Sequence, residues 1–180
     1  MCLLLLVSME ASSAVAQASA PTEYQVKAAF LFHFGQFVDW PAEAFHDASA
    51  PLTYCTLGED LFRGALETSL NGKSIGSHPL RIRHLTQTRE AAGCQVLFLA
   101  VEEKSVGETL ERLKGLPVLT VGDSKQFAQE GGMIGFCLED NKVRFEINLG
   151  AAEQAGLKIR ARLLTLAKKV IVAPATAKGT

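Results

Sequence analysis

The chain has 180 residues, of which 48% are apolar, and its formal net charge at pH 7 is −1. This length and composition predict one globular domain with a sizeable core. The near-neutral charge argues against nucleic-acid binding, which needs a basic surface. No apolar run reaches the roughly 18–20 residues that a helix needs to span a bilayer.

The first twenty residues differ from the rest and predict a secretory signal peptide over residues 1–20. The short apolar run Leu3–Val7 precedes a stretch of small residues with A-x-A patterns ending at Ala16, Ala18 and Ala20. Such patterns are typical of signal-peptide cleavage sites. Cleavage after residue 16 or 18 is favoured, because Pro21 follows Ala20. A cytosolic N-terminal extension is the alternative, and the missing basic n-region leaves the true start codon open.

An aromatic-rich stretch, residues 24–41, predicts the first helix. Thr22 and Gln25 have the spacing of a capping box, and Pro41 disfavours helix at the residue before it. Helical spacing gathers one broad apolar face from Val26, Phe30, Leu31, Phe34, Phe37 and Val38. We expect this helix to lie against a sheet. Phe32 falls in the polar sector, where it is either covered by another part of the domain or open to a partner.

Strands and helices alternate in the next part of the chain. Apolar runs and alternating patterns predict strands at residues 52–57, 80–85, 94–101 and 117–121. Helical spacing predicts a helix at 59–70 and a second after a capping box formed by Ser105 and Glu108. A short helix is predicted from Asp123 to Phe127. The order of elements is typical of an α/β layered domain.

The last third predicts a hairpin followed by helix. Residues 133–138 and 143–147 are two strands at hairpin spacing. Helical spacing then places Ile159, Leu163, Leu166 and Val170 in a C-terminal helix. We therefore expect one domain over 22–172, with a central, mostly parallel sheet flanked by helices and the hairpin toward one edge. The 94–101 and 117–121 strands should be central, and residues 173–180 should form a loose tail.

Three cysteines remain once Cys2 leaves with the signal peptide. None belongs to a C-x-x-C pair, so zinc and thioredoxin-like redox sites are poorly supported. In an oxidising compartment a disulfide is the usual outcome. Cys55 and Cys94 each adjoin a predicted strand, and a bridge closing their loop would contribute about 4 kcal/mol. Cys137 is then a buried free thiol, or an intermolecular or redox-labile one.

The sequence matches no complete motif for catalysis, metal binding or cofactor binding. Residues 72–74 match the end of a phosphate-binding loop, but Glu67 stands where its first glycine belongs. The four histidines lack metal-ligand spacing. We predict no catalytic residue, metal or cofactor. Basic residues gather near the C-terminus, where Arg160 and Arg162 are candidates for anion binding and a solvated face is the alternative. The full cluster is Lys158, Arg160, Arg162, Lys168 and Lys169.

Three blocks of the sequence resemble the YfiR family over about residues 24–170. The opening helix is similar in YQVKAAFLFHF and FVDWP, and the central strand in CQVLFLA. The C-terminal half is similar in GMIGF, VRFEINLGAAEQAGLKI and LLTLAKKV. This resemblance implies a periplasmic α/β protein that is not an enzyme and that forms dimers. It implies a Cys55–Cys94 disulfide, whereas a second family bridge near Cys137 lacks a local partner cysteine here.

The resemblance also implies a regulatory role. In that family the regulator binds the periplasmic sensor domain of an inner-membrane diguanylate cyclase and holds it inactive. An OmpA-like outer-membrane lipoprotein sequesters the regulator, after which cyclic di-GMP and biofilm formation rise. We expect Phe32, Arg144 and Glu146 to contact a partner. Alternatives are a periplasmic sensor that binds a small ligand near Arg160 and Arg162, and a hydrolase, which would need a cleft with convergent titratable groups.

Overall fold

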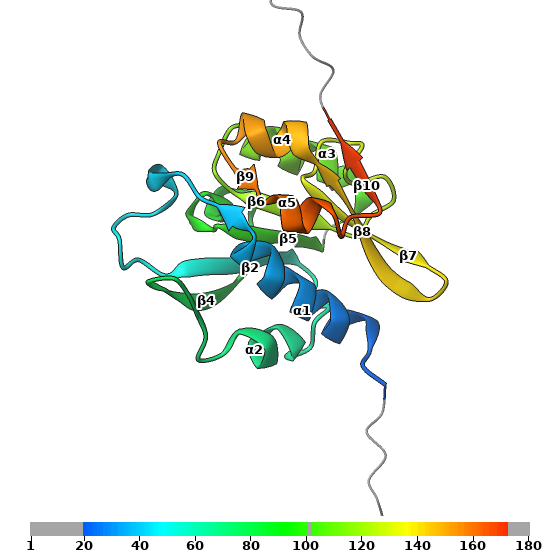
Figure 1. The fold of residues 1–180 in the computed structure, drawn as a ribbon, viewed down its shortest axis with the longest axis horizontal. Coiled ribbons are helices and arrows are strands. Elements are labelled where there is room, and N and C mark those ends of the chain that lie inside the picture. The colour runs from blue at the N-terminus through cyan, green and yellow to red at the C-terminus, as the bar shows by residue number, and fades with distance from the viewer. Residues whose placement is uncertain (1–19, 101, 173–180) are drawn as a thin grey trace, which may run out of the picture.

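The computed structural model describes residues 20–100 and 102–172 (Figure 1). The predicted tail at 173–180 and the predicted signal peptide up to residue 19 lie outside the described residues. The helices are α1 (Glu23–Gln36), α2 (Ala65–Leu70), α3 (Glu103–Leu113), α4 (Leu149–Gln154) and α5 (Ala161–Leu164), with 3-10 turns η1 (Ala42–Ala44) and η2 (Thr88–Gly93). The strands are β1 (Val38–Asp39), β2 (Leu52–Gly58), β3 (Ser74–Ile75), β4 (His78–Leu85), β5 (Val96–Ala100), β6 (Leu119–Gly122), β7 (Ile134–Glu139), β8 (Lys142–Asn148), β9 (Lys158–Ile159) and β10 (Lys169–Ile171). Within these ranges no helix has the length and apolarity to cross a membrane.

Eight strands form the main sheet in the order β10-β8-β7-β6-β5-β2-β4-β3. Neighbours from β4 through β7 are parallel, and so are β8 and β10. The β7–β8 hairpin and the β3–β4 pair are antiparallel. The predicted α/β fold with a mostly parallel sheet is confirmed. So are the central places of β5 and β6 and the position of the hairpin toward one edge.

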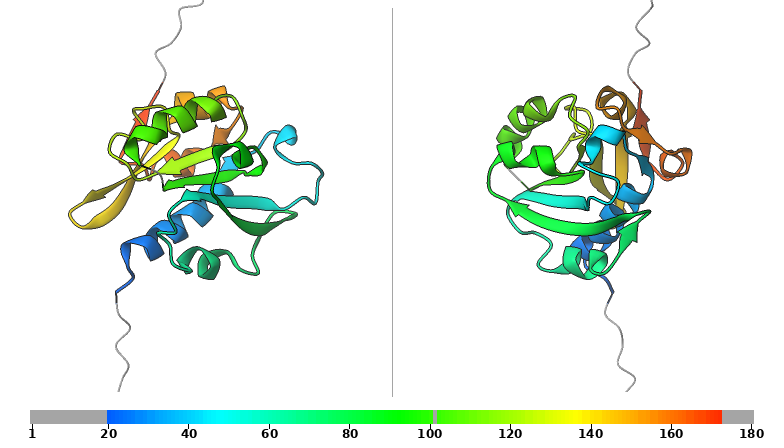
Figure 2. Two further views of the ribbon diagram at one scale, coloured as in Figure 1. Left: turned by 180° about the vertical axis from the view of Figure 1, so that it is seen from behind. Right: turned by 90° about the vertical axis from the view of Figure 1, so that its left-hand side faces the viewer.

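Apolar side chains fill a core on each face of the sheet, which lies between two helical layers (Figure 2). On the face covered by α1 and α2, Leu31 and Phe34 are buried with Phe98 of β5. On the face covered by α3, Val106 is buried with Leu97 of the same strand. Successive side chains of a strand point to opposite faces. This double burial explains why β5 is a continuous apolar run in the sequence.

The predicted capping box of α1 is confirmed, but its predicted end is wrong. The Thr22 hydroxyl accepts from the Gln25 N–H (3.3 Å), and the Thr22 N–H donates to the Gln25 side chain (2.7 Å). The helix ends before Pro41 is reached. Val38 and the next residue leave the helix to form β1, which pairs with Ile159 and Lys158 of β9. Pairing with a strand distant in sequence therefore overrides the local helical pattern.

Two other predicted helix starts are also wrong. The segment 59–70 is helical only from Ala65, because Arg63 and Gly64 have φ angles of +49° and +85°, which a right-handed helix excludes. The capping box at Ser105 does not form, because α3 begins two residues earlier in the chain. The N–H of Ser105 already bonds to the Glu102 carbonyl (2.8 Å) inside the first turn.

The region after β6 and the C-terminal region also differ from prediction. Turns replace the helix expected from Asp123 to Phe127, and Gln126 has φ +63°. The prediction of a C-terminal helix is wrong, because β9, the short α5 and β10 occupy that stretch. Leu166, expected in the core, is 57% exposed. Val170 pairs with Ile147 of β8 instead. Spacing of three or four residues between apolar side chains is compatible with one long helix. It is equally compatible with the observed arrangement, in which a single helical turn lies between two short strands.

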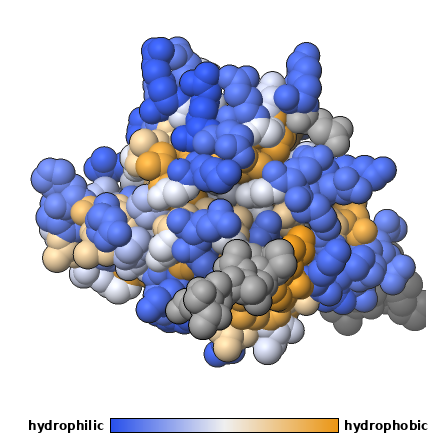
Figure 3. Space-filling view, turned by 90° about the horizontal axis from the view of Figure 1, so that it is seen from above, coloured by the Kyte–Doolittle hydropathy of each residue, from blue (hydrophilic) through white to orange (hydrophobic). Residues whose placement is uncertain are grey.

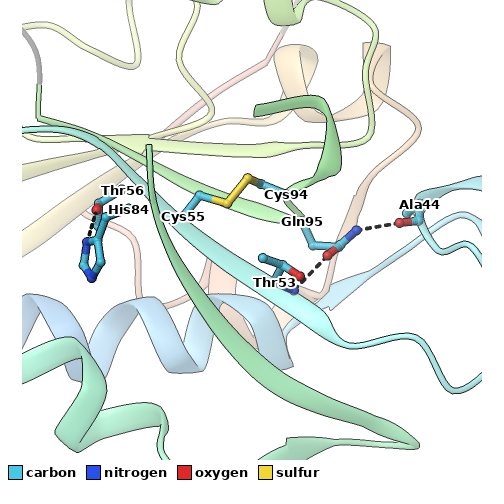
Figure 4. The surroundings of a disulfide bond; sticks show 7 residues. All are labelled: Ala44, Thr53, Cys55, Thr56, His84, Cys94 and Gln95. Atoms are coloured by element: carbon cyan, nitrogen blue, oxygen red, sulfur yellow. Dashed lines mark hydrogen bonds between the residues drawn. A yellow bond between two sulfur atoms is a disulfide. The ribbon is translucent and has the colours of Figure 1, made fainter. Parts of the chain in front are cut away.

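The predicted Cys55–Cys94 disulfide is present (Figure 4). Cys55 lies in β2, Cys94 lies two residues before β5, and their Cα atoms are 6.0 Å apart. Next to it, the buried Gln95 side chain accepts from the Thr53 N–H (2.8 Å) and donates to the Ala44 carbonyl (2.6 Å). Together the disulfide and this amide hold the start of β5 to β2 and to η1.

Candidate interaction surfaces

A buried lysine anchors the first half of α1 to the sheet. The Lys27 side chain is 4% exposed, and its Nζ lies 2.6 Å from Asp123 Oδ2 and 2.5 Å from Glu23 Oε1. The Tyr24 hydroxyl donates to the same Asp123 oxygen (2.9 Å). Asp123 directly follows β6. These contacts therefore fix α1 at the carboxyl ends of the parallel strands.

In open α/β sheets, ligands bind outside the carboxyl ends of the strands. Here Tyr24 and Lys27 occupy part of that edge, and their polar groups are already bonded to Asp123. The Tyr24 ring also packs edge-on against Phe62, with centroids 5.4 Å apart. Burial and the hydrogen bond to Asp123 raise the pKa of Tyr24 above its ordinary value. This cluster therefore serves the fold and leaves no polar group of these side chains free for a ligand.

Sequence reasoning missed this ion pair, although two signals were present. Lys27 shares a helical stripe with Leu31 and Phe34, so its side chain had to be buried or turned away. Asp123 directly follows an apolar strand, where side chains meet at the edge of a parallel sheet. Each residue has a common explanation when it is considered alone. Only the fold brings the two side chains together.

Phe32 is half-buried, so other parts of the domain cover its side chain in part. The Lys73 Nζ lies 4.3 Å from the centroid of its ring. The Phe32 carbonyl accepts a hydrogen bond from the Tyr54 hydroxyl (3.2 Å). Since Lys73 directly precedes β3, Phe32 lies toward the β3 edge of the sheet. A partner could reach this ring only beside the lysine.

Arg144 and Glu146 lie on the hairpin, near the opposite edge of the sheet. Arg144 pairs in register with Cys137, and the Gln129 amide donates to Glu146 Oε2 (2.6 Å). The alternate residues of β8 point to the α1 side, where Phe145 and Ile147 are buried and Val143 is partly buried. Arg144 and Glu146 therefore share one face of the hairpin. The structure does not bring them together with Phe32.

The hairpin extends from the body of the domain beyond its neighbours (Figure 1). Leu138, close to the turn, is 56% exposed. Lys168 donates to Glu139 at 2.9 Å, and this hydrogen bond lowers the pKa of the Glu139 carboxyl. Cys137 is a half-buried free thiol, and burial raises its pKa. The projecting tip thus combines an exposed leucine with flanking charges.

The C-terminal basic residues do not form one free cationic site. Nε and Nη2 of Arg160 lie 2.8 and 2.6 Å from Asp39 Oδ1. The Arg162 guanidinium lies 5.7 Å from the ring centroid of Phe37. Lys168 is paired with Glu139 on the hairpin. Because two of these charges are met by carboxylates, a small-anion site at Arg160 and Arg162 stays a prediction without support from the geometry.

The face that carries α3, α4 and β10 is mostly hydrophilic, with apolar residues visible between the polar side chains (Figure 3). A hollow of about 530 Å³ lies there. Its apolar lining includes Leu110 and Leu113 of α3, Met133, and Ile171 with the exposed Val172 at the end of β10. Its titratable lining residues are Glu111, Lys114 and Glu130, of which the first two pair with each other at 3.4 Å.

The family model DUF4154, described as YfiR/HmsC-like, matches residues 24–168. The chain belongs to the YfiR/HmsC-like family. Members of this family are regulators of diguanylate cyclase signalling and are not enzymes. The match covers all the described strands except β10, and it includes the Cys55–Cys94 disulfide.

Two solved structures align with this chain at low sequence identity. A conserved domain protein from Vibrio cholerae O1 biovar El Tor aligns with a TM-score of 0.54 and 10% identity over 82% of this chain and 60% of that one. An ABC domain in complex with L-Trp from Streptococcus pneumonia aligns with a TM-score of 0.47 and 11% identity over 66% and 55% of the two chains. The chain thus spans less than two thirds of either protein. At 10% identity, the first supports the fold of the YfiR/HmsC-like domain and nothing more.

One group of side chains in this YfiR/HmsC-like domain has the connectivity of a hydrolase triad. Thr56 Oγ1 lies 2.8 Å from Nδ1 of His84, and Nε2 of His84 lies 3.0 Å from Glu67 Oε1 (Figure 4 shows the first contact). Thr56 is only 2% exposed, so a substrate cannot reach its hydroxyl. These contacts instead tie α2 to β2 and β4. In the described ranges no cluster of three metal-binding side chains occurs either.

The hairpin register shows why Cys137 forms no disulfide across the β7–β8 ladder. Across the β7–β8 ladder the residue opposite Cys137 is Arg144. A cross-strand disulfide at this point would need a cysteine in the place of Arg144. Within residues 20–100 and 102–172, the Cys137 thiol has no disulfide partner.

Proposed function

We propose that this protein is a periplasmic repressor of an inner-membrane diguanylate cyclase. In this proposal residues 1–20 direct export, and the domain over 22–172 acts as a homodimer that binds the cyclase's periplasmic sensor domain. An OmpA-like outer-membrane lipoprotein relieves repression by sequestering it. The observation that carries the proposal is the YfiR/HmsC-like family match over residues 24–168. The disulfide supports the compartment, because disulfides persist in oxidising environments.

Repression requires that the protein bind the inactive cyclase more tightly than the active one. A ligand shifts a conformational equilibrium only by its differential affinity for the two states. A hundredfold preference for the inactive state, for example, would shift the equilibrium by about 2.7 kcal/mol. A lipoprotein that competes for the same regulator lowers its free concentration and removes this bias. No bond-making step is needed at any point.

The hairpin is our first choice for the cyclase contact. Leu138 at its tip is one of the few large apolar side chains exposed in the described part of the chain, and the paired charges of Glu139 and Lys168 lie beside it. Arg144 and Glu146 lie on the other face of the same hairpin. An exposed apolar anchor with charged neighbours suits a protein interface. Phe32 lies toward the other edge of the sheet, so a small partner that covers the hairpin would leave it free. Phe32 is then a candidate contact for a second partner.

Deleting the gene in its own host tests the proposal. We expect cellular cyclic di-GMP to rise, and to return to its original level when the wild-type gene is restored. Restoration with Leu138→Asp should not lower it, whereas Leu166→Asp, at an exposed leucine outside the hairpin, should behave as wild type. Unchanged cyclic di-GMP after deletion, in a strain that expresses the cyclase, would reject the regulatory role. Full repression by Leu138→Asp would reject the hairpin as the contact.

A further inference from the structure

The β4 side of the sheet ends in an open strand edge. β3 covers only the start of β4, through the pairs Ser74–Pro79 and Ile75–His78. The Leu80 N–H also bonds outward, to the Lys73 carbonyl (3.0 Å). Beyond that point β4 continues to Leu85 with β2 as its one strand neighbour in the described residues. We call residues 81–85 the β4 edge.

Backbone alternation decides which groups of the β4 edge face outward. Since the Leu80 N–H points away from β2, the N–H and C=O groups of Ile82 and His84 point the same way. The N–H and C=O groups of Arg81 and Arg83 face β2. No backbone or side-chain hydrogen bond elsewhere in the described chain reaches the backbone of Ile82 or His84. Four backbone groups are therefore available to an added strand.

The charge beside these groups is positive and not neutralised. Arg81 and Arg83 are exposed and, being two residues apart, lie on one face of β4. Neither forms a salt bridge within the described ranges, unlike His84, which contacts Glu67 on the other face. Both arginines line a hollow of about 530 Å³ beside Gln95, in which Glu43 is the one acidic lining residue. An incoming strand would meet unpaired guanidinium groups here.

We propose that the β4 edge binds an extended acidic segment of a partner protein as an added strand. Backbone hydrogen bonds to Ile82 and His84 would supply affinity, and carboxylates facing Arg81 and Arg83 would supply specificity. The other edge strand, β10, has three residues and offers a shorter ladder. This inference does not depend on the regulatory role, because it follows from the edge itself.

A second copy of this chain is a poor occupant of the same edge. Antiparallel pairing about a two-fold axis at Arg83 would place the two Arg83 side chains directly opposite each other. Like charges in such cross-strand pairs are destabilising. Edge arginines of this kind oppose self-association, as charged edge residues commonly do. They do not oppose a strand that carries carboxylates.

The test uses the mature protein, isotope-labelled for NMR, and two short peptides. One alternates valine with glutamate, and the other alternates valine with lysine. We expect saturable binding of the glutamate peptide alone, weakened by added salt, with hydrogen exchange slowed at the Ile82 and His84 amides. Absence of saturable binding, equal binding of the lysine peptide, or protection confined to other amides would each overturn the proposal.

Charge reversal supplies a second, independent measurement. The variant Arg81→Glu with Arg83→Glu should bind the glutamate peptide at least about tenfold more weakly, because attraction becomes repulsion. The matched control Arg89→Glu reverses an exposed charge on η2, outside the β4 edge, and should bind as wild type. Unchanged binding by the double variant would refute the role of the arginines. If that variant fails to fold, the salt dependence and the amide protection of the wild-type protein still decide the matter.

Discussion

Neutralising Asp123 should destabilise the fold more than its surface position suggests. Asp123→Asn keeps the shape of the side chain and an acceptor for the Tyr24 hydroxyl, but it leaves the 4%-exposed Lys27 with Glu23 as its carboxylate partner. Removing one partner of a buried ion pair costs about 3–5 kcal/mol. Because Glu23 stays in contact with Nζ of Lys27, we expect a loss of stability at the lower end of this range, about 3 kcal/mol. Urea unfolding, monitored by circular dichroism, measures this loss of stability. We expect a lower midpoint urea concentration and an unchanged dependence of the unfolding free energy on urea concentration.

A second substitution separates a buried charge from simple loss of packing. In the Asp123→Asn background, Lys27→Met removes the cation and keeps an apolar chain of similar length, so it should restore about 1–2 kcal/mol. Glu23→Gln is the matched control, since Glu23 is 39% exposed and its removal should cost under about 1 kcal/mol. The reasoning is refuted if the double variant is less stable than Asp123→Asn alone.

Three further predictions concern the core. Burial raises the pKa of both Tyr24 and Tyr54 above the ordinary value of about 10. The folded state therefore holds these two protons more tightly than the unfolded state does. The contribution of the two tyrosines to the free energy of unfolding should be constant below about pH 10 and should fall as the pH rises above that value. Tyrosinate absorbance should appear only when the protein unfolds. Replacing Cys55 and Cys94 by alanine should cost about 4 kcal/mol in urea unfolding, because the bridge spans 39 residues. Gly35→Ala should cost about 1–3 kcal/mol, since a Cβ there would overlap the Tyr54 hydroxyl.

Each of these predictions has its own control. Gly107→Ala introduces a Cβ into open space within α3 and should stabilise by about 0.5–1 kcal/mol, opposite in sign to Gly35→Ala. Cys137→Ser should leave the unfolding midpoint nearly unchanged, in contrast to loss of the bridge, because Cys137 is a free thiol near the surface. Tyrosinate absorbance that developed near pH 10 while circular dichroism stayed native would contradict the raised pKa of the two tyrosines.

Much of the fold could be predicted from the sequence where a pattern is local and strong. The run of apolar residues at 94–101 predicted a central strand, and β5 lies there between the two cores. The spacing of residues 133–138 and 143–147 predicted the hairpin, and the antiparallel register agrees. The capping box at Thr22 formed because its two partners are three residues apart and need nothing else from the fold.

Two of the failures share one physical cause, which is long-range pairing. Val38 left the expected helix because β9, more than a hundred residues away, offers it a strand partner. Val170 did the same by joining β8. Positive φ angles at Arg63 and Gln126 ended two further expected helices at residues that give little sign of it in the sequence.

The same cause limited what could be said of the surfaces. Phe32 and the pair Arg144 and Glu146 were placed correctly on their own elements, but strand order alone shows that they lie toward opposite edges of the sheet. The Lys27–Asp123 ion pair joins residues from distant parts of the chain. The β4 edge exists only because β3 pairs with β4 no further along than Pro79. Contacts of this kind are properties of the topology.

Cyclase activity under direct control of the purified protein is the most decisive measurement. Spheroplasts that carry the membrane cyclase, from a strain lacking both this protein and the lipoprotein, expose the sensor domain to the medium. We expect cyclic di-GMP in them to fall in a saturable way as the disulfide-bonded protein is added, and to recover when the soluble part of the lipoprotein follows. Cyclic di-GMP that stays constant at saturating protein would contradict repression.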